Sequence, residues 1–283
     1  MISREPTAAA ARFRDLINRP EDEIDLAEAA LLIAKGVNDA LDIDAYLSQI
    51  EGLARQLQQR LSESVGETER ILALNRFLFD EQGFEPNVDN YYDPRNSFLN
   101  EVLERRVGIP ISLSILYMEI GRRVGLPLRG VSFPGHFLVK CKVNDGVVVL
   151  DPYCRGVSLS LNDLQQRLGD VQGGEVSRAI IAGMLVSANK KEILARVLRN
   201  LKTIYVQREE HAQALAVMEW IITLAPADAA EVRDRGLLFA KLECPRAAVE
   251  HLERYLELAP DAEDAHELRG RVVELRHAAA RLN

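Results

Sequence analysis

The sequence predicts an α+β protein that is predominantly helical, with a small antiparallel sheet in its middle and helical repeats at its C-terminal end. Apolar residues recur every three or four positions in the N-terminal part and again near the C-terminus, which is typical of helices packed on a core. Between these regions lie short segments rich in Val, Leu and Phe. We therefore expect an N-terminal helical region over 1–85, a mixed core over 86–190 and helical repeats over 191–283.

The N-terminal region carries apolar stripes and no evident chemistry. Leu26, Ala30 and Ile33 form one stripe, and similar stripes follow at residues 53–61 and 71–78. An apolar stripe of this kind is the face that a helix buries against a neighbour. The region is expected to pack on the core.

The composition changes after Gly83, where a segment rich in Asn, Asp, Pro and Tyr indicates an ordered loop. Ser97 is a plausible cap for a helix that runs to about Arg106, because its hydroxyl can satisfy a free backbone amide. Pro110 is expected to start the next helix, since its missing N–H has no helical partner in the first turn.

The apolar period then changes from helix to strand. Residues 128–133, 137–143 and 147–150 are expected to be strands, with a hairpin turn at 144–146. If Asp145 and Gly146 form a two-residue turn, Asp151 pairs opposite Lys140 and is offset along the sheet from His136. A bulge or a longer loop would bring His136 and Asp151 together. A polar helix is expected near residues 161–168.

The C-terminal region repeats itself every 34 residues: Ala225-Pro226 recurs as Ala259-Pro260, and Ala214 matches Ala248. This period, with a small residue where two helices cross and a closing proline, is the tetratricopeptide signature. Two repeats are fewer than a free-standing array needs, so they are expected to pack on the preceding domain, with a capping helix at 266–282.

Composition narrows the classes of function. The net charge of -8 argues against a general nucleic-acid surface. Three widely spaced cysteines fit neither a disulfide framework nor a metal site, and no cofactor is implied. The N-terminus has no signal-peptide core, and no apolar run is long enough for a membrane helix. We expect a cytoplasmic protein without a membrane partner.

Four short motifs carry a family resemblance. They are Asn96-Ser97-Phe98-Leu99, the segment GIPISLS at 108–114, Pro134-Gly135-His136-Phe137 and Asp151-Pro152. With them, residues 25–280 resemble the transglutaminase-like superfamily, and more closely the SirB-type family, which joins such a core to tetratricopeptide repeats. The resemblance implies a papain-like core, and the family name carries an association with gene regulation.

Active members of the superfamily place a cysteine at the start of the core helix, a histidine on one strand and an aspartate on the next. That triad performs acyl transfer, because the histidine is the base and the carboxylate orients it. Carried over to this chain, the histidine is His136 and the aspartate is Asp151, but the cysteine position is Pro110. The resemblance therefore implies a core that has lost its nucleophile.

Other residues are weaker nucleophile candidates. Strand alternation directs Cys141 away from His136, and it directs Cys154 away from Asp151 if the strand continues that far. Cys244 lies near a repeat turn. Ser112, close to the expected cysteine position, is either a nucleophile or a hydroxyl that bonds local backbone at the helix start.

The same segment offers candidate binding residues. Tyr91 and Tyr92, with Asn96 and Pro110, are expected to line the cleft, although a buried structural role for the two rings is an alternative. His136 and Asp151 also have a structural interpretation, as a hydrogen-bonded ring beside a turn carboxylate.

Three functions remain open. The first is a non-catalytic protein-interaction or regulatory protein, whose degenerate cleft and repeat surface bind a protein or peptide partner. The second is an amide or ester hydrolase or an acyl transferase, using His136 and Asp151 with Ser112 or water as the attacking group. The third is a scaffold whose core only positions the repeats.

Overall fold

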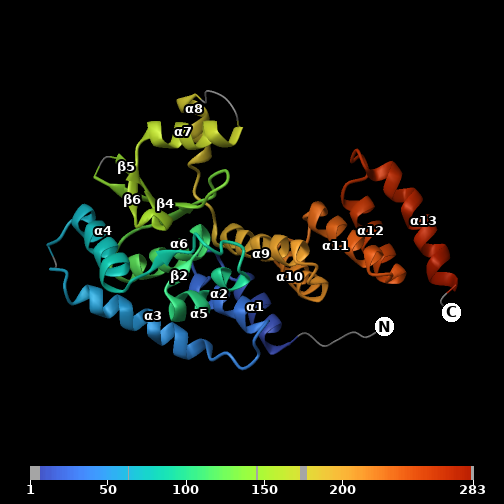
Figure 1. Ribbon diagram of the computed structural model, residues 1–283, viewed down its shortest axis with the longest axis horizontal. Helices are drawn as coiled ribbons and strands as arrows, with labels where there is room; N and C mark the ends of the chain where they lie inside the picture. Colours follow the sequence, from blue (N-terminus) through green and yellow to red (C-terminus); the bar gives the residue numbers. More distant parts are fainter. Residues whose placement is uncertain (1–6, 63, 145, 173–176, 282–283) are drawn as a thin grey trace. The chain divides into compact units, whose positions relative to one another are not determined.

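The computed structural model describes residues 7–62, 64–144, 146–172 and 177–281. The chain divides into two compact units, Met1–Val197 and Leu198–Asn283. Helices dominate both units, and strands occur in the first (Figure 1). The predicted fold class, a predominantly helical α+β protein with a helical C-terminal region, is confirmed.

The first unit begins with four helices and a π-helical turn. Their bounds are α1 Ala8–Ile17, α2 Leu26–Lys35, α3 Ile43–Gln58, α4 Glu67–Asn75 and the π-helix η1 Arg76–Glu81. Thr7, Asp25 and Asp42 start the first three helices, because each side chain accepts a hydrogen bond from a backbone N–H of the first turn.

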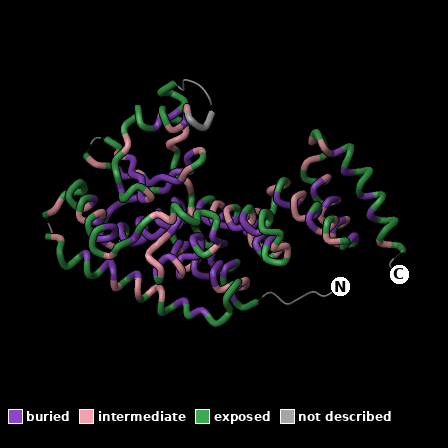
Figure 2. Tube along the Cα trace, in the orientation of Figure 1, coloured by how far each residue is buried: buried purple, intermediate pink, exposed green. Residues whose placement is uncertain are grey.

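The central helix is α6, Pro110–Arg123, which begins at the predicted proline. Every residue from Pro110 to Gly121 is buried, and Figure 2 shows the buried trace gathered around it. Before it come the short parallel strands β1 Glu85–Pro86 and β2 Val107–Gly108, the turn η2 Pro94–Ser97 and helix α5 Leu99–Arg105. Ser97 is not the expected cap: it ends η2, and its hydroxyl has no hydrogen-bond partner among the described residues.

The sheet is an antiparallel meander in the order β3-β4-β5-β6. Its strands are β3 Arg129–Val131, β4 Leu138–Val143, β5 Gly146–Asp151 and β6 Val157–Leu159. The first three were expected. The sequence does not predict β6. This strand has only three residues, and only Leu159 among them is partly buried, so it lacks an apolar pattern.

The hairpin register differs from the expected one. Val143 pairs with Gly146, so the connection is residues 144–145, and Asp145 itself lies outside the described residues. Val139 therefore pairs with Leu150, which places Asp151 beside Leu138 rather than opposite Lys140. This shift moves the aspartate two residues closer to His136 along β4, and no bulge is needed.

Helices cover both faces of the sheet. α6 contacts β3 and β4 on one face, while α7 Leu161–Gln172 and α8 Arg178–Met184 lie over the other (Figure 1). One apolar cluster joins the sheet to α7 and α8: Val131, Phe133, Leu138, Val149, Leu164, Leu168 and Ile181. The sheet is thus packed between two helical layers.

The second unit contains the end of α9 Lys190–Gln207, then α10 His211–Leu224, α11 Ala229–Lys241, α12 Pro245–Leu258 and α13 Ala265–Arg281. The 34-residue repeat seen in the sequence is also present in the backbone conformation. Glu209 and Glu243, one period apart, turn between helices with φ of 58° and 56°. Ala214 and Ala248 are both fully buried, as expected for a crossing point that admits only a small side chain.

Enlarging a crossing alanine is expected to destabilise the second unit. Ala248→Leu should lower the free energy of unfolding by about 1–3 kcal/mol, because the site has no room for extra methylene groups. Urea unfolding followed by the fluorescence of Trp220, the single tryptophan, in α10, measures this. Ala278→Leu, at an exposed position of α13, is the matched control; equal losses in both variants would contradict the packing argument.

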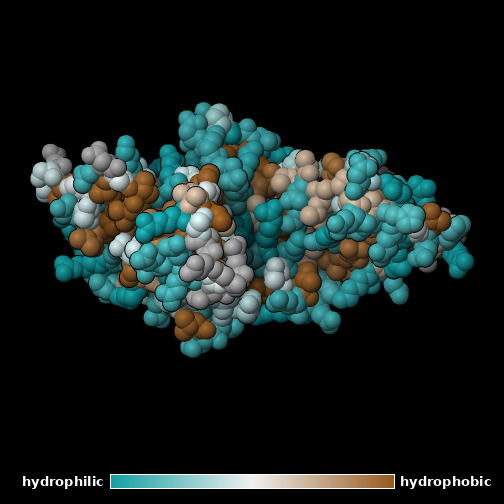
Figure 3. Space-filling model, turned by 90° about the horizontal axis from the view of Figure 1, so that it is seen from above, coloured by the Kyte–Doolittle hydropathy of each residue, from teal (hydrophilic) through white to brown (hydrophobic). Residues whose placement is uncertain are grey.

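The face seen in Figure 3 is mostly hydrophilic, with separate apolar patches. None of the helices in the described ranges is long and apolar enough to cross a membrane.

Candidate functional site

His136 and Asp151 meet. His136 lies just before β4, and Asp151 is the last residue of β5. The Nε2 atom of His136 lies 2.9 Å from Oδ1 of Asp151. A carboxylate only accepts hydrogen bonds, so Nε2–H donates to it, and in the neutral ring Nδ1 carries the lone pair. The His136 side chain is 18% exposed, whereas that of Asp151 is completely buried. The arrangement is that of an oriented imidazole base.

Asp151 is held by more than the histidine. Its Oδ1 also accepts the backbone N–H groups of Tyr153 and Cys154, at 3.1 and 3.3 Å, in the 3₁₀ turn η3 Pro152–Cys154. Arg167 of α7 donates from Nη1 to Oδ2 at 2.6 Å. Burial acts to raise the pKa of Asp151, but the hydrogen bonds and charges of His136 and Arg167 outweigh it and lower the pKa to about 2.

Cys154 lies beside this pair, because the condition for it to face away, a strand that continues past Asp151, is not met. The strand ends at Asp151 and η3 turns the chain, so the Cys154 Sγ lies 3.8 Å from Arg167 Nη2. Burial and the Asp151 charge nevertheless raise the pKa of the Cys154 thiol, with Arg167 acting in the opposite direction. Burial likewise raises the pKa of Cys141, which is buried in β4. Neither environment favours a thiolate.

Aromatic rings extend the site over the surface. Tyr153 packs edge-to-face on His136, with ring centres 5.8 Å apart, and Tyr91 packs edge-to-face on Tyr153 at 6.5 Å. Tyr92 contacts Tyr91 in turn at 5.2 Å. Tyr91 is 37% and Tyr92 58% exposed. We refer to Tyr91, Tyr92, Tyr153 and His136 as the aromatic cluster.

Ser112 is buried and its hydroxyl is engaged. Its Oγ donates to the Asn96 carbonyl at 2.6 Å and accepts the backbone N–H of Ile109 at 3.1 Å. This geometry favours the helix-start role over the nucleophile role, since both bonds hold the entry to α6.

Asn96 and Pro110 were expected to line the cleft with the tyrosines, but both are buried. The Asn96 amide donates to the carbonyls of Asn90 and Tyr91, at 2.8 and 3.2 Å. Asn96 thus shapes the loop that carries Tyr91 and Tyr92 without lining the surface itself. Pro110 occupies the first turn of α6, and α6 contacts η3, the turn that follows Asp151.

Sequence reasoning missed Arg167 and Tyr153. Arg167 sits on a polar helix, where a basic residue is ordinarily solvated, so its ion pair with Asp151 had no local signal. Tyr153 follows Asp151-Pro152 by one residue and was detectable only if the strand was known to end there. In the described part of the chain, no three His, Cys, Asp or Glu side chains gather as a metal site.

The low pKa of Asp151 predicts an acid-side loss of stability. A carboxyl that titrates near 2 when folded and near about 3.9 when unfolded contributes stability above about pH 4 and loses it as the pH falls towards 2. The contribution is on the order of 2–3 kcal/mol. It is measured as the difference between wild type and Asp151→Asn in urea unfolding from pH 2 to 7. Parallel profiles for the two proteins would contradict it.

Comparisons with known proteins agree with the division into a transglutaminase-like core and helical repeats. Residues 44–199 match the family model of the transglutaminase-like superfamily, and residues 201–272 match that of the tetratricopeptide repeat. A UPF0162 protein of Xylella fastidiosa strain 9a5c is 39% identical over 93% of this chain and 94% of its own length. A UPF0162 protein of Vibrio cholerae is 30% identical over 93% and 97%. Protein SirB1 of Salmonella typhimurium is 24% identical over 94% and 98%. No solved structure matches the chain.

Proposed function

This chain belongs to the transglutaminase-like superfamily, and we propose that it is a non-catalytic protein-interaction or regulatory protein. The observation that carries the proposal is Pro110 at the start of α6, where active superfamily members place their cysteine. A proline has no nucleophilic atom. The neighbouring hydroxyl of Ser112 is committed to backbone partners, and the pKa of Cys154 is raised. The chain thus keeps the histidine base, His136, but has no nucleophilic side chain for it to activate.

The aromatic cluster is the proposed binding surface of the first unit. Exposed tyrosines supply rigid apolar area with a polar tip, which suits an extended peptide. Arg167 and His136 lie beside these rings and are partly exposed, so they offer polar contacts to the same ligand. A regulatory role would run through proteins, because the net charge of -8 disfavours DNA.

The repeats supply a second proposed surface. A groove of about 500 Å³ lies between α9 and α11 within the second unit. Val206 and Leu237 are exposed large apolar residues on its two sides, and the ion-paired Lys202 and Asp234 supply polar groups to its lining. Tetratricopeptide repeats present a surface of this kind to helices or peptides.

Peptide display on the full chain tests the proposal. Random linear peptides are selected on the immobilised wild type, and their dissociation constants are then measured for variants. We expect one class to be weakened at least about tenfold by Tyr92→Ala and another by Leu237→Ala. Val37→Ala, at an exposed apolar position outside both surfaces, is the matched control. Selected peptides that bind all variants equally would overturn the proposal.

A second function is favoured by the 2.9 Å contact of His136 and Asp151. His136 Nδ1 could accept a proton from an attacking water, giving an amide or ester hydrolase without a covalent intermediate. Turnover by the wild type that His136→Ala abolishes would separate this function from the first.

A further inference from the structure

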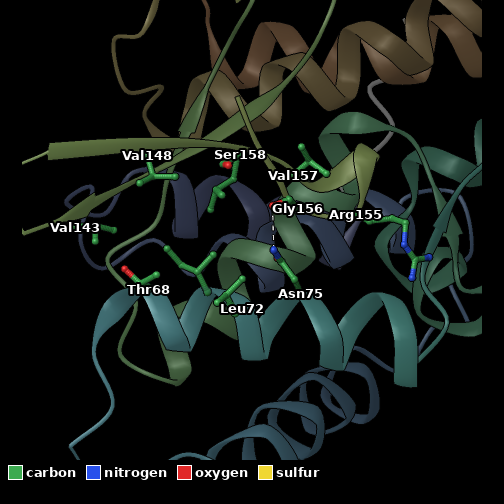
Figure 4. Close-up of a pocket in the computed structure, with 11 residues that line it drawn as sticks. Thr68, Leu72, Asn75, Val143, Val148, Arg155, Gly156, Val157 and Ser158 are labelled. Atoms are coloured by element: carbon green, nitrogen blue, oxygen red, sulfur yellow. Dashed lines mark hydrogen bonds between the residues drawn. The ribbon is translucent and has the colours of Figure 1, made fainter. Parts of the chain in front are cut away.

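Asn75 joins three elements around the turn that follows Asp151. It is the last residue of α4, directly before the π-helix η1. Its Nδ2 donates to the Gly156 carbonyl at 3.0 Å, the bond drawn in Figure 4. Its Oδ1 accepts the hydroxyl of Tyr117 at 2.8 Å. Both ends of the amide are therefore used, and a π-helical turn at this point is a feature often found at functional sites.

Tyr117 anchors this amide to the core. The residue is completely buried in α6, and its ring stacks on Phe79 of η1 with centres 6.1 Å apart. Burial, with a smaller contribution from Cys141, raises the pKa of Tyr117, so its hydroxyl stays protonated and donates. Asn75 is thus fixed from the side of α6.

The Asn75 amide packs so closely against Gly156 that a side chain at position 156 would clash with it. Its φ is 73°, and a Cβ there would lie 2.0 Å from Asn75 Oδ1. The Gly156 N–H donates to the backbone carbonyl of Asp151 at 2.8 Å. The turn closed by this bond contains the Tyr153 and Cys154 amides that hold the Asp151 carboxylate.

These bonds form one path from Tyr117 through Asn75 and Gly156 to Asp151. We propose that Asn75 is a positioning residue for the His136–Asp151 pair, acting through the Gly156 turn. Its donated hydrogen bond fixes the turn, and the turn fixes the carboxylate that selects the Nε2–H tautomer of His136. The inference rests on the same pair as the proposed function. Its test uses no ligand and no substrate, so the two can fail separately.

The surroundings of Asn75 leave room for a shorter side chain. Asn75 is half-buried and lines a cavity of about 480 Å³ between α4 and the strands β5 and β6, together with Leu72, Val148 and Val157 (Figure 4). A shorter side chain there enlarges an existing cavity. The expected change is therefore in the orientation of the turn.

The experiment follows the histidine rings by nitrogen-15 NMR. The chain has five histidines, so the four outside the site are internal references. In Asn75→Ala, the Nε2 proton of His136 should exchange with water roughly tenfold faster. A factor of this size corresponds to the free energy of about one lost hydrogen bond. The ring should also show a mixture of tautomers. The acid-side loss of stability due to Asp151 should be smaller and should end at a higher pH, because the folded-state pKa of Asp151 moves towards its unfolded value.

Three variants separate positioning from general stability. Asn75→Asp keeps an acceptor for Tyr117 but cannot donate to Gly156, so it should behave like Asn75→Ala. Tyr117→Phe removes only the anchor and should give a smaller change in the same direction. Ile17→Ala, in the distant α1 core, should lower stability without altering His136.

The proposal is overturned if His136 keeps its wild-type tautomer and exchange rate in Asn75→Asp and Asn75→Ala. It is equally overturned if Ile17→Ala, matched for lost stability, alters His136 as much. Should Asn75→Ala fail to fold, Asn75→Asp and Tyr117→Phe decide the matter by the same readout.

Discussion

Replacing Asp151 with alanine is expected to lower the free energy of unfolding by about 3 kcal/mol. The carboxylate is completely buried and accepts hydrogen bonds from His136, Arg167 and two backbone amides. Its removal leaves these donors without their acceptor, and Arg167, two-thirds buried, loses its counter-charge. Urea unfolding at neutral pH, with hydrogen exchange in β4 and β5, measures the loss.

Two further variants define the cause. Asp151→Asn keeps an acceptor oxygen for the two amides but loses the charge, so a loss of about 2–3 kcal/mol, no larger than that of Asp151→Ala, is expected. Asp80→Ala removes an exposed carboxylate that pairs with exposed Arg155 and should cost less than about 1 kcal/mol. If Asp151→Ala costs no more than Asp80→Ala, the buried carboxylate does not organise the site.

Replacing Pro110 with cysteine is expected to restore a reactive thiol. The first turn of a helix stabilises a thiolate, and the superfamily triad would place the His136 imidazole beside it, so the pKa of the new thiol should fall from about 8.5 to below about 7.5. The ultraviolet absorbance of the thiolate as a function of pH gives this value. Cys154 and Cys244, which are exposed, are replaced by serine beforehand.

Two controls separate the effect of the helix N-terminus on the thiol pKa from the effect of His136. Ala229→Cys places a thiol at the first position of α11, a helix N-terminus in the second unit, whereas His136 belongs to the first. Adding His136→Ala to Pro110→Cys should raise the thiol pKa back towards the Ala229→Cys value. An unshifted pKa in Pro110→Cys would show that position 110 does not correspond to the nucleophile position of the superfamily.

The repeats and the central helix could be predicted because their signals are local. A proline fits a first helical turn wherever it occurs, and Pro110 starts α6. The spacing of Ala225 and Ala259 reappears in nearly equal backbone angles, with φ of -136° and -138°. These features depend on neighbours within a few residues or on a strict period.

The details of the site depended on contacts that the sequence does not carry. The hairpin register was wrong by two residues because Asn144 enters the left-handed region, with a φ of 50°, and moves the connection back along the chain. Arg167 reaches Asp151 from a different layer of the fold. Ser97 failed as a cap because Pro94 starts a separate 3₁₀ turn that ends on it. In each case the local sequence allows more than one conformation or contact, and the tertiary structure determines which one forms.

The most direct measurement is His136-dependent acyl transfer by the wild-type chain. Wild type, His136→Ala and Pro110→Cys are incubated with an activated ester, and with a glutamine peptide and an amine, and product formation is followed. A non-catalytic core should give no difference between wild type and His136→Ala, and the new thiol should be acylated in Pro110→Cys. Turnover by the wild type that His136→Ala abolishes would contradict a non-catalytic core and establish the water-activating enzyme instead.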